Sequence, residues 1–222
     1  PIIQKFYDSI GIFEKPVEGE KYILFPLHFQ PEATTLIHGK WHVEQATLIE
    51  NLSKSTPISH KIYVKEHRNG YGNRSLHFYK RIKKLPNVRL LSPHTNNFNL
   101  IKNCSLVATI TGTTGWEALL FHKPVISFGN RFYNIVEGVK KVEKIEELPT
   151  IIRERLDHKI DHNKVVQFTA AVLESNYEGL ARYPGSCNNR SLTKENVKLL
   201  ADGIGDYLKK LDSQIQPISI RH

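Results

Sequence analysis

Between residues 20 and 157, short apolar runs alternate with stretches in which apolar residues recur every three or four positions. The first pattern is typical of buried β-strands and the second of helices that pack on a sheet. The segments predicted as strands are residues 22–27, 62–64, 88–91, 106–110, 125–128 and 139–142. Those predicted as helices are residues 43–55, 75–84, 97–103, 116–121 and 145–155. Strands that alternate with helices predict an α/β fold: a Rossmann-like parallel sheet with helices on both of its faces.

The pattern changes at both ends of this region. After residue 157 the strand pattern stops, and residues 164–176 and 194–211 are predicted as helices joined by a loop rich in Gly, Pro and Asn. We therefore expect three parts: a lead-in segment (1–19), the sheet domain (20–157) and a C-terminal helical extension that packs on it (158–222). Because the chain begins at Pro1 and contains no methionine, we interpret it as a piece of a longer polypeptide.

Each of the first five predicted strands is followed by a cluster of polar residues. The clusters are residues 26–32, 65–70, 92–95, 111–117 and 129–133. In an open parallel sheet, ligands bind in the crevice outside the carboxyl ends of the strands. The sequence therefore predicts one ligand site, built from five loops, at that edge of the sheet.

The loop after the fourth strand, Thr-Gly-Thr-Thr-Gly-Trp-Glu, has the composition of an anion-binding turn. Its small residues let backbone N–H groups approach a ligand, and the helix that follows carries a partial positive charge at its N-terminus. Five residues are predicted to bind phosphate here: Thr111, Gly112, Thr113, Thr114 and Gly115. Glu117 can accept hydrogen bonds from ribose hydroxyls, or it can form a capping box with Thr114, which is compatible with phosphate binding. The loop is neither GxGxxG nor GxxxxGK[ST], which disfavours a dinucleotide oxidoreductase and a P-loop NTPase.

Two more clusters carry groups that suit a nucleotide. After the second strand, Lys65 and Arg68 supply positive charge, and His67 either donates to a phosphate or serves as a structural residue. After the fifth strand, Phe132 and Tyr133 either stack on a base or pack beneath their loop. We predict that all five residues contribute to donor binding.

The cluster after the first strand combines an imidazole, an amide and a carboxylate. His28, Gln30 and Glu32 alternate along the chain, so their side chains can share one face. Gln30 is predicted to bind the donor. A carboxylate near an imidazole can act as a base or orient one, which makes His28, Glu32 and His67 the candidate catalytic groups, although ordinary loop capping explains each of them equally well. We assign no catalytic residue.

Composition narrows the class of ligand. The chain has 31 Lys and Arg against 22 Asp and Glu, a formal charge of +9. This favours an anionic partner: a phosphorylated small molecule, an acidic glycan, an anionic membrane face or nucleic acid. Nucleic acid is disfavoured because the aromatic residues, 9% of the chain, are not interleaved with basic ones. No apolar run approaches the roughly 20 residues of a membrane-spanning helix.

Cysteine and histidine usage argues against disulfides and metals. The two cysteines, Cys104 and Cys187, form no CxxC motif, which favours a reducing cytosol. The 11 histidines include no HExxH motif, and His158 and His162 lie in a charged segment that we interpret as solvated. With no Asp-x-Asp pair either, we expect neither a metal nor another cofactor.

Four longer motifs contain these clusters in order: FPLHFQPEATT (25–35), YVKEH (63–67), LPNVRLLSP (85–93) and TITGTTGWEALLFHKPVISFG (109–129). In combination they resemble the bacterial capsule and surface polysaccharide biosynthesis proteins. These are glycosyltransferases of the GT-B type, among them transferases that use CMP-Kdo. The resemblance covers roughly residues 20–150.

The resemblance implies the carboxy-terminal, donor-binding half of a two-domain enzyme whose missing amino-terminal half holds most of the acceptor. It implies that Gln30 and Pro31 match the family's QP motif. His67 would match the histidine of its HP motif, with Arg68 in place of the proline. Glu117 would lie where GT-B enzymes often place a ribose-binding glutamate.

These observations lead to one functional hypothesis and two alternatives. We expect a cytoplasmic glycosyltransferase, peripheral at the inner membrane face, that moves a sugar from a CMP- or UDP-linked donor to a capsular or lipid-linked glycan acceptor. As a fragment, the chain can bind the donor and still be inactive. The alternatives are a nucleotide-sugar 2-epimerase of the same architecture and a non-catalytic basic module that binds glycan or membrane.

Overall fold

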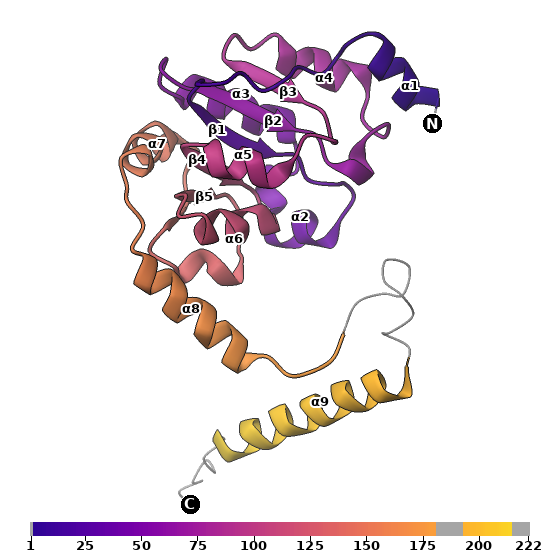
Figure 1. The fold of residues 1–222 in the computed structure, drawn as a ribbon, viewed down its shortest axis with the longest axis vertical. Coiled ribbons are helices and arrows are strands. Elements are labelled where there is room, and N and C mark those ends of the chain that lie inside the picture. Colours follow the sequence, from indigo (N-terminus) through magenta and orange to yellow (C-terminus); the bar gives the residue numbers. More distant parts are fainter. Residues whose placement is uncertain (1, 181–192, 215–222) are drawn as a thin grey trace, which may run out of the picture. The chain divides into compact units, whose positions relative to one another are not determined.

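The computed structural model of the chain describes residues 2–180 and 193–214. The chain divides into two compact units, Pro1–Gln167 and Phe168–His222 (Figure 1). The division falls within helix α8 (His162–Ser175), ten residues beyond the expected boundary at residue 157. Each unit is described by itself below.

The first unit is built on a six-stranded sheet in which all neighbouring strands are parallel. Its strands are β1 (Tyr22–Pro26), β2 (Lys61–Lys65), β3 (Val88–Leu91), β4 (Leu106–Thr109), β5 (Val125–Ser127) and β6 (Val139–Lys141). These match the six predicted strands, and the predicted Rossmann-like fold is confirmed. The strand order β3-β2-β1-β4-β5-β6 reverses direction between β1 and β4. This reversal is the switch point at which open parallel sheets bind ligands.

Helices cover both faces of the sheet (Figure 1). On one face, α3 (Gln45–Ser55) contacts both α4 (Leu76–Lys83) and α7 (Leu148–Leu156). On the other face, α5 (Asn97–Asn103) contacts α6 (Thr113–Leu120). Because both faces are covered, the central strands β1 and β4 bury side chains on both sides. Such strands appear in a sequence as continuous apolar runs, which is why the pattern identified them.

The lead-in segment expected over residues 1–19 belongs, from Ile2 onward, to the first unit. Helix α1 (Ile2–Ser9) places Tyr7 in the hydrophobic core, and its hydroxyl donates to the main-chain oxygen of Arg74 at 2.7 Å. Ile12 is also buried in this core. Glu14 then pairs with Leu91 in a parallel bridge beside β3. A single short helix ahead of the sheet lacks the repeating pattern of the domain, so its packing is not evident from the sequence.

The second unit contains the end of α8 and helix α9 (Lys194–Gln214), which agree with the two helices predicted there. The buried Asn196 side chain fixes the preceding segment, because it accepts from the Leu180 N–H at 2.7 Å and donates to the Leu180 oxygen at 3.1 Å. Most of the predicted 179–189 loop lies outside the described residues. The packing of residues 158–222 on the sheet domain stays a prediction.

Candidate functional site

The loops that follow β1 to β5 are bonded to one another at the carboxyl edge of the sheet. Four hydrogen bonds join neighbouring loops: Lys65 Nζ to Pro93 O (3.4 Å), Asn97 Nδ2 to Glu117 Oε2 (2.9 Å), Thr111 N to His28 Nε2 (3.1 Å) and Tyr133 Oη to Gly112 O (2.6 Å). The β1 and β5 segments are also joined, since the Asn130 N–H donates to the His38 oxygen at 3.0 Å. The clusters that the sequence singled out are therefore parts of one continuous edge.

Helix α6 begins at this edge without a side-chain cap. Its N-cap residue is Gly112, which has no side chain to accept from the first turn. The predicted capping box is wrong, because Thr114 lies inside the helix and Glu117 accepts from Asn97 instead. The Gly115 N–H donates to the Gly112 oxygen at 3.2 Å, which leaves the Thr113 and Thr114 N–H groups of the first turn to bind an anion. The helix dipole favours negative charge there.

Two glycines at the start of α6, Gly112 and Gly115, are required by close packing. A Cβ on Gly112 would lie 2.8 Å from Thr109 Oγ1, and one on Gly115 would lie 2.7 Å from the Tyr133 hydroxyl oxygen. Of the loop threonines, Thr111 and Thr114 are buried and the Thr113 side chain is exposed. The small residues predicted to let a ligand approach therefore also allow close packing against Thr109 and Tyr133.

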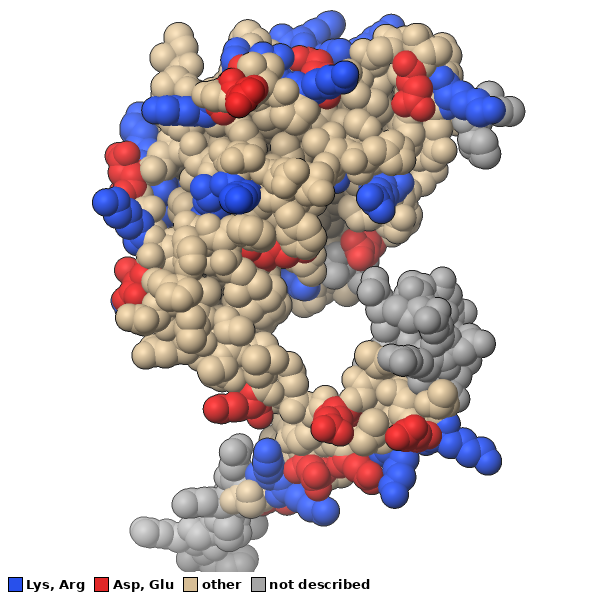
Figure 2. All heavy atoms as spheres, in the orientation of Figure 1, with Lys and Arg blue, Asp and Glu red and all other residues tan. Residues whose placement is uncertain are grey.

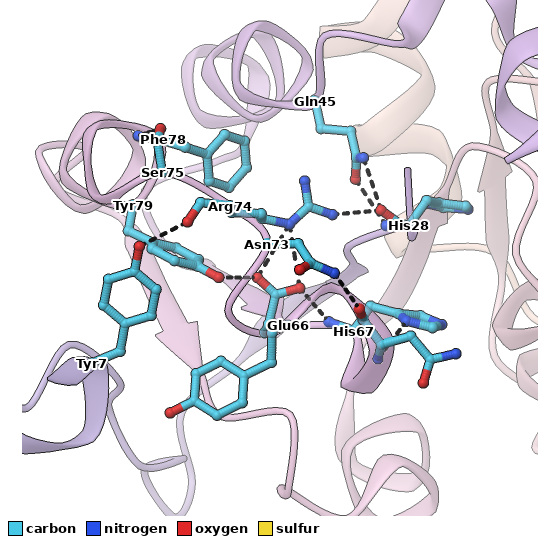
Figure 3. Close-up of polar contacts among 12 residues, drawn as sticks. Tyr7, His28, Gln45, Glu66, His67, Asn73, Arg74, Ser75, Phe78 and Tyr79 are labelled. Atoms are coloured by element: carbon cyan, nitrogen blue, oxygen red, sulfur yellow. Dashed lines mark hydrogen bonds and ion pairs between the residues drawn. The ribbon is translucent and has the colours of Figure 1, made fainter. Parts of the chain in front are cut away.

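His28 is one of those supports, and the Gln45 and Arg74 side chains bond to its main chain (Figure 3). The Gln45 side chain accepts from its N–H at 2.8 Å and donates to its oxygen at 3.0 Å, while Nε2 accepts from the Thr111 N–H. Burial lowers the pKa of His28 to about 3, with smaller contributions from the nearby charges of His67 and Arg74. The neutral ring has one nitrogen lone pair, on Nε2, and this lone pair already accepts the Thr111 N–H. It therefore does not take a proton from a substrate. His28 therefore positions the β4–α6 loop, which corrects its candidacy as a catalytic group.

A buried ion pair fixes the loop after β2 (Figure 3). Glu66 is fully buried and accepts from the His67 N–H at 2.6 Å, from the Tyr79 hydroxyl at 2.6 Å and from Arg74 Nε at about 3.2 Å. Arg74 also donates from Nη2 to the main-chain oxygen of His28. The loops after β1 and β2 are thus joined by a charged bond in the interior. The sequence pattern missed Arg74 and Gln45, although a carboxylate in an apolar strand end signals a buried partner.

The remaining groups of the β2 loop stay within reach of a ligand. His67 is half-buried and its Nδ1 accepts from the Asn69 N–H at 3.2 Å, so its neutral ring carries the proton on Nε2, which can donate. Burial is the main cause of the lowered pKa values of both His67 and Lys65. Arg68 and Glu32 are exposed at the same edge.

The other predicted donor-binding residues differ in accessibility. Tyr133 is fully buried beneath the β4–α6 loop, which corrects its expected contact with a base. Phe132 is half-exposed, 5.6 Å from the Trp116 ring. Gln30 donates to the Val43 oxygen at 2.7 Å and lines a pocket of about 250 Å³ together with Arg74 and Phe78.

Among the described residues, no group of three or more His, Cys, Asp or Glu side chains is placed to hold a metal ion. None of the helices in the described ranges combines the length and apolar character needed to cross a bilayer. Cys104 is a buried free cysteine, and Cys187 lies outside the described residues.

Comparison with known proteins places the chain in a family. The sequence model of the family described as capsule polysaccharide biosynthesis protein matches residues 14–176, well over half of the chain. None of the curated proteins matches it. This family match agrees with the resemblance carried by the four motifs.

Solved structures share the fold at low sequence identity. One is Thermosulfurimonas dismutans KpsC, a beta Kdo 2,7 transferase, which is 17% identical with a TM-score of 0.50 over 74% of this chain and 52% of that one. Another is the Methanocaldococcus jannaschii UDP-GlcNAc 2-epimerase in complex with UDP-GlcNAc and UDP, also 17% identical with a TM-score of 0.50, over 79% and 49%. The chain thus spans about half the length of these structures and has the fold of one half of a GT-B protein. On the family match and this fold, the chain belongs to the capsule polysaccharide biosynthesis protein family.

Proposed function

We propose that the chain is the donor-binding half of a glycosyltransferase that moves a sugar from a nucleotide-sugar donor to a capsular or other surface polysaccharide. The observation that carries this proposal is the uncapped N-terminus of α6 at the switch point of the sheet, with Glu117 and the β2 cations beside it. Family membership and the GT-B fold support it.

The donor's phosphate is the group that needs stabilisation in such a reaction. When the bond from the sugar to the phosphate breaks, negative charge grows on the phosphate oxygen, and preorganised N–H groups and cations lower the barrier. The first turn of α6 supplies N–H groups, and Lys65, His67 and Arg68 supply further donors. Glu117 would bind the ribose, held in place by Asn97. No metal is part of this proposal, and no base is assigned; the exposed Glu32 is the remaining carboxylate candidate in the β1 loop.

The same geometry fits a second enzyme of this architecture, a nucleotide-sugar 2-epimerase, because the match to the archaeal epimerase is as good as the match to the transferase. An epimerase would turn over a UDP-N-acetylhexosamine without an acceptor. A non-catalytic basic module is less well supported. On the face drawn in Figure 2, Lys and Arg side chains are interspersed with Asp and Glu and form no continuous patch.

Partners and location follow from the reaction class. The donor would be CMP- or UDP-linked, the acceptor a glycan or lipid-linked glycan, and the other half of the GT-B fold would hold that acceptor. A cytoplasmic enzyme at the inner membrane face would meet both substrates, and its net charge of +9 favours contact with anionic lipid.

Calorimetric titration with UDP, CMP and their sugar conjugates tests nucleotide binding. We expect at least one nucleotide to bind, and Glu117→Gln to weaken it about tenfold, since a hydrogen bond to a charged group contributes about 1.5 kcal/mol. Glu146→Gln, an exposed glutamate before α7, is the matched control and leaves the affinity unchanged. Absence of binding by a folded sample would contradict the proposal. Acceptor-free turnover would select the epimerase.

A further inference from the structure

Within the part of the chain that the structure describes, Arg131 is a half-buried arginine without a hydrogen-bond or ion-pair partner. It directly follows the β5 loop glycine and asparagine and precedes the short helix η3 (Phe132–Ile135). Its Nε is buried with no hydrogen-bond partner, and among the described residues the guanidinium forms no ion pair. By contrast, Arg74 and Arg89 of the same unit are both paired with carboxylates. Burying a cation without a partner costs free energy, so the partly buried Arg131 guanidinium indicates a ligand that would pair with it.

The residues that follow Arg131 are hydrogen-bonded to the start of α6 and to the β5 loop. The Tyr133 hydroxyl donates at 2.6 Å to the main-chain oxygen of Gly112, which is the N-cap residue of α6. Asn134 donates to the Gly129 oxygen at 2.8 Å and closes the β5 loop on itself. The Arg131 charge acts on both residues that support the β4–α6 loop. It makes a small contribution to the lowered pKa of His28, which supports Thr111, and it partly offsets the effect of burial on the pKa of Tyr133.

Other unused hydrogen-bonding groups lie on the same two loops. Thr111 Oγ1 and Asn134 Oδ1 are buried and, like Arg131 Nε, have no hydrogen-bond partner. Buried polar atoms are usually bonded, so such atoms on adjoining loops mark a place suited to a polar ligand. Arg131 Nε and the Thr111 hydroxyl can donate to an anion, whereas the Asn134 oxygen only accepts. The N-terminus of α6 beside them has no side-chain cap. Its helix dipole and the cation favour the same kind of ligand, an anion.

We propose that Arg131 is a phosphate-binding residue of this site, which acts together with the uncapped N-terminus of α6. The inference rests on the proposed function, because the phosphate is that of the nucleotide. A guanidinium matches the geometry of phosphate oxygens and donates two parallel hydrogen bonds to them. Lys65 supplies a point charge without this fork, and one of its three donors is bonded to the Pro93 oxygen.

The experiment compares nucleotides with nucleosides, because only the former carry phosphate. Affinities of UDP, CMP, uridine and cytidine are measured by NMR titration for the wild type, Arg131→Gln and Arg153→Gln. Arg153 is exposed on α7, so its replacement removes the same charge away from this edge. We expect Arg131→Gln to weaken UDP or CMP ten- to a hundredfold, to leave the nucleosides unchanged, and Arg153→Gln to resemble the wild type.

Stability gives a second readout. Because Arg131 has no partner to lose, Arg131→Gln without ligand should melt at the wild-type temperature or above it. Arg131→Lys, which keeps the charge but not the planar fork, should bind nucleotide with intermediate affinity. An unchanged ratio of nucleotide to nucleoside affinity in both variants would overturn the role of Arg131 while leaving the proposed function intact. A wild-type chain that binds no nucleotide would overturn both.

Discussion

At the scale of single residues, the side chains at the carboxyl edge divide into those that face a ligand and those that hold the loops. His67, Lys65 and Glu117 keep polar atoms at the edge, whereas His28 and Tyr133 are buried under it. Residue type and position after a strand predict that all five lie at this edge. They do not predict which side chains face the ligand and which hold the loops, because this depends on contacts with residues far away in the chain.

The buried state of His28 has a consequence for stability. Its pKa is about 3 in the folded chain and 6.5 in its ordinary state, so between these values the unfolded chain binds a proton that the folded chain does not. Stability therefore falls as the pH is lowered from 6.5, and His28 alone accounts for a loss of about 2 kcal/mol at pH 5.

We expect the variant His28→Gln to show a smaller loss of unfolding free energy between pH 7 and pH 5 than the wild type. Urea denaturation at several pH values measures this difference. His77→Gln, an exposed position of α4, is the matched control. If His28→Gln and the wild type lose the same free energy over this range, the histidine is not buried in the neutral form.

At the scale of elements, the sequence pattern predicts all six strands and most of the helices to within a few residues. It succeeds because strands covered on both faces are apolar throughout, and because turn residues separate them from the helices. It misses helix α2 (Ala33–His38), whose six residues include two threonines and an isoleucine, which are poor helix formers. It also misses α1, which is stabilised by contacts with residues 71 and 74.

Arg74 joins the loops after β1 and β2, since it pairs with Glu66 and donates to the His28 oxygen. The sequence pattern does not predict this connection. Glu66 and Arg74 are eight residues apart, and only the folded loop shows that they are paired. Removing one partner of a buried pair leaves an uncompensated charge, which destabilises by about 3 kcal/mol. We therefore expect Arg74→Gln to lower the free energy of unfolding by about that amount and to weaken nucleotide binding, because both loops lose their connection.

The matched control is Arg81→Gln in helix α4, seven residues after Arg74. Arg81 pairs with Glu50 between α3 and α4, but both side chains are partly exposed. Partly exposed pairs contribute up to about 1 kcal/mol, so this variant should lose clearly less stability than Arg74→Gln and keep the wild-type affinity. Denaturant unfolding and calorimetry measure the two quantities. Equal effects of the two replacements would show that the buried pair has no special role.

At the scale of the whole molecule, the chain has one half of a GT-B fold and spans about half of the matched structures. The sheet edge was predictable from the sequence because five polar clusters follow five strands. The connection of Arg131 with α6 was not, because it depends on how the β5 loop folds against Gly112. The central claim is that one edge, at the reversal of the strand order, binds the phosphate of a nucleotide.

A competing surface makes this claim testable. A second groove, of about 660 Å³, lies between residues 16–21 and helix α5. It is lined by three asparagines of the α5 segment and by Glu18 and Lys21, and contains neither Arg131 nor any residue of the β4–α6 loop.

The most direct measurement is a map of backbone amide chemical-shift changes in the isotope-labelled chain as UDP or CMP is added. We predict that the largest changes fall on Thr113 and Thr114 in the first turn of α6 and on Arg131, with smaller ones after β2 and β3. Changes centred on residues 16–21 and the outer side of α5, with the α6 turn unaffected, would contradict this account.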